Sequence, residues 1–207
     1  MTKIITIIAL FVASLMQAQT PFEQEMGKAL QTWNGGKLVE AVAQLEQIAL
    51  KEQNNWLPNY YLALIITSEA FEEQDKIKME LLLKKAQKAL DICNKTESDN
   101  PEVLIMQAMI HTAYIVYDPM TNGQKLSGDV MYILNKAYKI APENPRVVFQ
   151  KASFEKGMAE YFGQDTATMC AQIEKAIELF ATFKPESNLH PNWGLDRAQN
   201  ELKNCKI

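Results

Sequence analysis

The sequence contains little glycine, cysteine and histidine, and each scarcity excludes a class of protein. Glycine accounts for 8 of 207 residues, which is well below the average of roughly 7% in globular proteins. Three cysteines and two histidines are too few for a disulfide framework or for a site that holds several metal ions. The 25 acidic residues outnumber the 21 basic ones, which argues against a nucleic-acid-binding surface.

Motifs that carry catalysis are also missing. The chain contains no Gly-x-Ser-x-Gly, His-Glu-x-x-His or Cys-x-x-Cys sequence and no glycine-rich phosphate loop. The segment that begins at Asp118 has a faint likeness to a calcium loop, but Met120 and Asp129 replace required ligands. His111 lies in an apolar run and His190 precedes a proline, which favours structural roles for both. We therefore expect no enzyme activity, no metal site and no cofactor.

The first 18 residues have the pattern of a secretory signal peptide. Lys3 precedes an apolar run over residues 4–16, and Ala18 is a small residue at a suitable cleavage position. This run is shorter than the roughly 17 residues that a membrane-spanning helix needs. We expect cleavage near Ala18, export to the periplasm or out of the cell, and no stable membrane insertion of the mature chain, residues 19–207. The alternative is an uncleaved N-terminal anchor.

Five prolines divide the mature chain at regular distances. Each stands just before an apolar run with helical spacing, and proline suits the first helical position because the N–H that it lacks would be unpaired there. Asn100 and Asn144 precede two of them as suitable N-caps. The prolines are Pro21, Pro58, Pro101, Pro145 and Pro191. A small residue follows each proline, and these are Ala29, Ala63, Ala108, Ala152 and Ala198.

Further amphipathic segments lie between the proline-led helices. Their apolar residues recur every three or four positions, the spacing of a helix with one buried face, and no segment alternates as a strand would. The segments are residues 37–53, 75–93, 128–141 and 166–183, and a closing helix is expected at 191–204. The sequence therefore predicts an all-α protein of about four helical hairpins with a C-terminal capping helix.

Several short stretches resemble the tetratricopeptide repeat (TPR) family. Residues 36–41 look like the TPR turn, residues 61–63 look like its first-helix pair of leucine and a small residue, and residues 137–142 look like the end of its second helix. Residues 189–194 and the helix after them look like small exported TPR proteins of Gram-negative bacteria. The resemblance implies one TPR-like α-solenoid over residues 19–207. It also implies a scaffold or adaptor that binds a protein or peptide through its concave face. The alternative is a small-ligand-binding component of an envelope transport system.

The resemblance also nominates partner-binding positions, because the first helix of each TPR hairpin lines the concave face. The nominated residues are Trp33, Tyr60, Met109, Arg146, Phe149 and Lys156. Aromatic and methionine side chains suit an apolar or extended peptide, while Arg146 and Lys156 could hold a carboxylate. The alternative for the aromatic and methionine residues is packing in the core. We expect residues 118–128 to form a loop, which is longer than a TPR turn and is a second candidate surface.

The cysteines support one local hypothesis. If residues 166–183 and the closing helix form an antiparallel hairpin, Phe180 meets Leu195 at one end and Cys170 meets Cys205 at the other. Disulfides persist in the oxidising compartments to which exported proteins are sent. We therefore predict a Cys170–Cys205 disulfide, with two buried thiols as the alternative. Cys93 lies on an apolar stripe and is expected to be an inert core residue.

Overall fold

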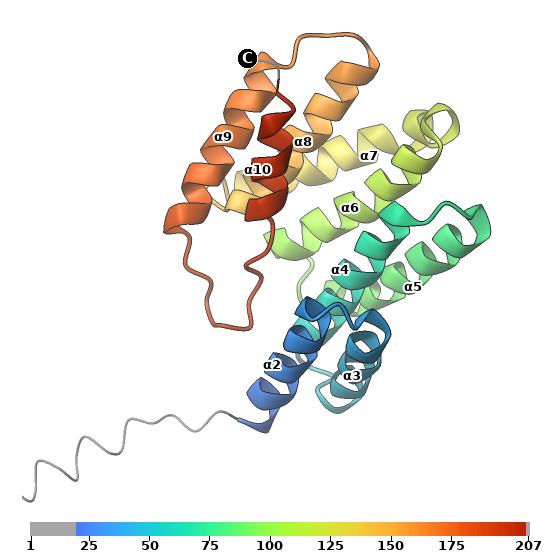
Figure 1. The fold of residues 1–207 in the computed structure, drawn as a ribbon, viewed down its shortest axis with the longest axis vertical. Coiled ribbons are helices and arrows are strands. Elements are labelled where there is room, and N and C mark those ends of the chain that lie inside the picture. The colour runs from blue at the N-terminus through green and yellow to red at the C-terminus, as the bar shows by residue number, and fades with distance from the viewer. Residues whose placement is uncertain (1–19, 206–207) are drawn as a thin grey trace, which may run out of the picture.

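The computed structural model describes residues 20–205, and in this range it consists of helices and connecting loops (Figure 1). These residues form nine helices and no strand, which confirms the all-α class. The helices are α2 (Pro21–Asn34), α3 (Leu38–Lys51), α4 (Leu57–Glu72), α5 (Lys76–Asn94), α6 (Pro101–Tyr117), α7 (Pro119–Ile140), α8 (Pro145–Tyr161), α9 (Ala167–Thr182) and α10 (Leu195–Lys203). None of these helices is long and apolar enough to cross a bilayer. The expected signal peptide and its cleavage site lie outside the described residues.

The helix starts follow the cues in the sequence. Thr20 and Glu23 form a reciprocal capping box, in which the Thr20 N–H donates to the Glu23 carboxylate at 2.7 Å. The side chains of Asn100 and Asn144 accept hydrogen bonds from the first-turn backbone of α6 and α8. These contacts satisfy N–H groups that a helix start leaves without a partner.

Two expected boundaries are wrong, and both lie beside prolines. Residues 118–128 are not a loop, because α7 begins at Pro119, where the Asp118 side chain accepts a hydrogen bond from the Thr121 N–H at 3.1 Å. The closing helix begins at Leu195 and not at Pro191. It follows Gly194, whose φ of 112° is a left-handed conformation that favours glycine. A Cβ atom there would also lie only 3.0 Å from the Phe180 ring.

The helices pack as consecutive pairs. Within each pair α2 contacts α3, α4 contacts α5, α6 contacts α7 and α8 contacts α9, while α4, α6 and α8 contact one another in series. The small residues that follow the prolines are all at most 2% exposed. A small side chain at a helix contact lets two axes approach to about 8 Å. The regular alanines therefore lie at buried positions of the core, where small side chains let helices approach closely.

The loop over residues 183–194, which we call the strap, returns from α9 toward the N-terminal half before α10 begins (Figure 1). The Tyr61 hydroxyl of α4 donates to the Leu189 carbonyl at 3.0 Å. The Trp193 indole N–H donates to the Tyr60 hydroxyl at 2.9 Å. These contacts join residues that are more than 120 positions apart in the sequence, so the strap ties the end of the chain to α4.

A disulfide joins Cys170 of α9 to Cys205, just beyond α10, with an S–S distance of 2.02 Å. The structure thus brings together the two cysteines that the helical pattern pairs. Cys93 is a free thiol that is buried in the core. Burial raises the pKa of this thiol to about 12, and the reactive thiolate is therefore scarce at neutral pH.

Replacing Ala152 by leucine should destabilise the protein by about 1–3 kcal/mol, because the added methylene groups have no room at a packed contact. Ala152 is 1% exposed and belongs to the cluster that α8 shares with α9 and α10. The measurement is urea unfolding followed by circular dichroism. Ala181→Leu, at an exposed position of α9, is the matched control and should change little. Equal stability of the Ala152→Leu variant and the wild type would contradict the packing described here.

Reducing the disulfide should lower the free energy of unfolding by about 4 kcal/mol in the chain-entropy model, given the 35 residues that separate the cysteines. Thiol titration of the denatured protein should find one free thiol before reduction and three after it, since the chain has three cysteines. A count of three without reductant would show that the bond does not form.

Candidate functional site

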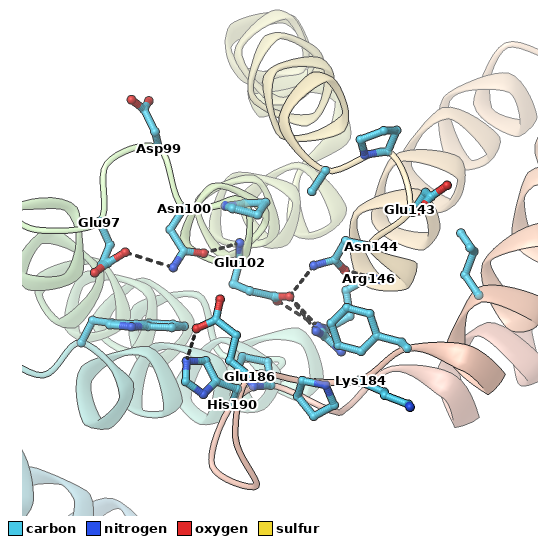
Figure 2. A pocket seen from close by; sticks show the side chains of 18 of the residues that line it. Glu97, Asp99, Asn100, Glu102, Glu143, Asn144, Arg146, Lys184, Glu186 and His190 are labelled. Carbon is cyan, nitrogen blue, oxygen red and sulfur yellow. Dashed lines mark hydrogen bonds and ion pairs between the residues drawn. The ribbon is translucent and has the colours of Figure 1, made fainter.

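A buried ion pair lies at the centre of the molecule, where α6 and α8 begin (Figure 2). The Arg146 Nη2 atom lies 2.6 Å from Glu102 Oε1, and Arg146 Nε lies 2.9 Å from Glu102 Oε2. The Asn144 side-chain amide donates to the same carboxylate at 2.7 Å. Arg146 is 1% exposed, so the pair is removed from water and depends on these hydrogen bonds. Arg146 thus binds a carboxylate of its own chain.

The ion pair extends into an aromatic network. The Tyr60 hydroxyl lies 3.4 Å from Glu102 Oε2 and also accepts the hydrogen bond from Trp193. Burial, together with the Glu102 charge, holds the pKa of Tyr60 well above its usual value. The Phe183 ring lies over the Arg146 guanidinium at 4.7 Å, a cation–π contact. The network therefore connects α4, α6, α8 and the strap.

A polar pocket of about 1090 Å³ opens beside the pair, between the strap and the loops that precede α6 and α8 (Figure 2). Four of its five acidic side chains, those of Glu97, Asp99, Glu102 and Glu186, have partners within the protein. The Asn100 amide donates to Glu97 at 3.2 Å, and Glu186 lies 3.3 Å from the His190 ring. No group of three or more metal-ligating side chains occurs within residues 20–205. Most of the acidic groups of this pocket therefore hold its loops together.

A second hollow, the apolar cleft, has a volume of about 670 Å³ and lies between α6, α7, α8 and α10, with Phe71 of α4 at one side. Most of its wall is hydrocarbon or aromatic. The main apolar residues of the wall are Phe71, Met109, Ile115, Val116, Leu134, Phe154, Met158, Tyr161 and Phe162. Small-molecule sites are typically concave and apolar with a few polar groups, and this cleft has that character.

Large apolar side chains are left uncovered around the cleft. Val116, Met120, Tyr161 and Phe162 line it, and each is between 58% and 71% exposed. They come from the end of α6, the start of α7 and the end of α8. The Tyr161 hydroxyl contacts the Met120 sulfur at 3.2 Å, so α7 and α8 meet there. A group of exposed apolar side chains beside a hollow is typical of a binding site.

Three charged residues also line the cleft. Glu160 pairs with Lys156, whose Nζ atom lies 2.6 Å from the Glu160 carboxylate. Glu201 accepts a hydrogen bond from the Ser153 hydroxyl at 2.7 Å. The third is Arg197 of α10, which is exposed and also lines a second, polar groove of about 1000 Å³.

The nominated partner-binding residues do not share one surface. Met109 lies in the wall of the apolar cleft, and Trp33 lines the polar groove with Tyr61, whose ring it meets edge-on. Tyr60 and Phe149 are at most 2% exposed and belong to the core. The remaining two, Arg146 and Lys156, are also buried and already hold Glu102 and Glu160. The structure therefore does not bring these six residues together on one exposed face, and a role for them in binding a partner stays a prediction.

Sequence reasoning missed the exposed residues around the cleft. Helical periodicity indicates that Val116 or Tyr161 lies on an apolar stripe, but not that its neighbours leave it uncovered. Of this group only Met120 lies within residues 118–128, the second surface that the sequence nominates. Arg197 falls on the polar side of the closing helix, where a charged residue is ordinary and does not by itself indicate a binding role.

No protein-family model and no curated protein matches the chain. Among solved structures, the chain is similar to the HusA haemophore from Porphyromonas gingivalis, with a TM-score of 0.79 and 22% sequence identity. The match covers 92% of this chain and 96% of the haemophore chain. At this level of identity the similarity shows a common fold.

Replacing Arg146 by methionine should cost about 3–5 kcal/mol of stability, because it leaves the Glu102 carboxylate buried without its counter-charge. Urea unfolding measures the loss. The double variant Glu102→Gln/Arg146→Met should recover part of it, since no charge then remains buried. Lys51→Met breaks the exposed 2.9 Å pair with Glu25 and should cost less than about 1 kcal/mol. A loss no larger than that of the exposed pair would show that the buried pair does not hold the helices together.

Proposed function

We propose that this chain is an exported, non-enzymatic binding protein that captures a flat, largely apolar small molecule of the tetrapyrrole class in the apolar cleft. The observation that carries the proposal is the group of uncovered apolar side chains, Val116, Met120, Tyr161 and Phe162, beside a hollow of about 670 Å³. Burial of such side chains against a ligand releases about 25 cal/mol for each Å² of apolar surface. An apolar ring system would therefore gain affinity at each of them.

The similarity to a haemophore supports the choice of ligand class. The HusA protein shares the fold over nearly its whole length, and haem is a flat macrocycle with two apolar faces. Among the described residues that line the cleft, the side chains able to ligate iron are methionines and Tyr161 rather than histidine or cysteine. Contacts with the ring faces would therefore supply much of the affinity, and Tyr161 and Met120, whose side chains contact each other, would be the candidates to hold the iron.

We further propose that the consecutive helix pairs are TPR-like units and that residues 1–18 direct export. The in-series contacts of α4, α6 and α8, and the burial of the small residues that follow the prolines, support the first proposal. A protein or peptide adaptor is the weaker reading, because most of the nominated concave residues are buried in the core or paired within the chain.

Haem added to the purified mature protein should shift its Soret absorption with a dissociation constant in the micromolar range or below. Val116→Asp should weaken binding by at least about tenfold, because the ligand would bury an unpaired carboxylate. Ile92→Asp changes an exposed aliphatic residue in the last turn of α5, away from the cleft, and should bind haem like the wild type.

Two results would contradict the proposal. Absence of any spectral change with the wild-type protein would exclude haem as the ligand. Unchanged binding by a folded Val116→Asp variant would place the ligand elsewhere, and the polar groove lined by Trp33 would then be the next site to test.

A further inference from the structure

Among the described residues that line the apolar cleft, Arg197 is the single cation. It lies on α10 at the boundary between the cleft and the polar groove. Within residues 20–205 its guanidinium forms no ion pair and donates no side-chain hydrogen bond. Glu201 and Glu72 act on it electrostatically, but neither lies within ion-pair distance. Five N–H donors are therefore available at the edge of a largely apolar surface.

The two carboxylates of the cleft do not compensate for this cation directly. Glu160 is bonded to Lys156 and Glu201 to Ser153. A planar guanidinium matches the geometry of a carboxylate with two parallel hydrogen bonds. The arrangement thus combines an apolar wall with an unpaired guanidinium, at the water-exposed border of that wall, that can bind a carboxylate.

We propose that Arg197 binds a carboxylate of the ligand, and that the cleft therefore selects molecules that carry an acidic group at the edge of a flat apolar body. This inference rests on the proposed function and adds the chemistry that orients the ligand. The apolar body lies against the cleft, and the acidic edge points toward the polar groove, where water and Arg197 both solvate it. The arrangement avoids the cost of burying a charge in the apolar interior.

The experiment compares protoporphyrin IX, which has two free carboxylates, with its dimethyl ester, which has the same ring system and no acidic group. Absorption titrations of the wild-type mature protein should show at least about tenfold tighter binding of the diacid, the usual effect of a hydrogen bond to a charged group. Arg197→Gln should lose this preference: affinity for the diacid falls by about the same factor, and affinity for the ester is unchanged.

Lys203→Gln is the matched control, because Lys203 is an exposed cation of the same helix that does not line the cleft. It should keep the preference for the diacid. Equal binding of diacid and ester by the wild type, or an equal loss for both ligands in Arg197→Gln, would overturn the role of Arg197 while the proposed function stands. Failure of the wild type to bind either ligand would overturn both.

Discussion

The Glu102–Arg146 ion pair is the contact on which the arrangement of the helices depends. Its two charges come from α6 and α8, and its hydrogen bonds reach α4 through Tyr60 and the strap through Trp193. Because a buried charge left without its partner is costly, movements of α6 against α8 that separate the pair are disfavoured. Apolar packing between helices alone would tolerate small sliding movements that the paired charges oppose.

The C-terminal segment does more than cap the fold. It covers α9, to which the Cys170–Cys205 disulfide fixes it. It also supplies Arg197 and Glu201 to the cleft. In the nine-residue helix α10 only Ala198 is fully buried, and Leu202 packs beside it while partly exposed. The disulfide and the strap therefore fix a wall of the cleft as well as the end of the fold.

The sequence predicts the helices well because their signals are local. Apolar spacing, prolines in the first turn and asparagine caps act within a few residues, and the pairing of Cys170 with Cys205 follows from extending two such patterns. The prediction is wrong at Pro191, where the strap and not a helix follows, because the strap depends on contacts with α4 more than 120 residues away. The partner of Arg146 is Glu102, 44 positions earlier, and no local pattern reveals such a pair. The cleft could not be predicted for the same reason, since it is defined by what the neighbouring helices leave uncovered.

The junction of α6 and α7 has a consequence for recognition. One residue, Asp118, separates the two helices, and the Asn122 side-chain amide donates to the Tyr114 carbonyl across the corner at 2.7 Å. Val116 and Met120 flank this corner. Because the backbone between them is already ordered, a ligand that enters beside them does not have to immobilise a loop. For the ligand proposed above, the entropy of ordering this corner is therefore lost when the chain folds, which lowers the conformational cost of binding.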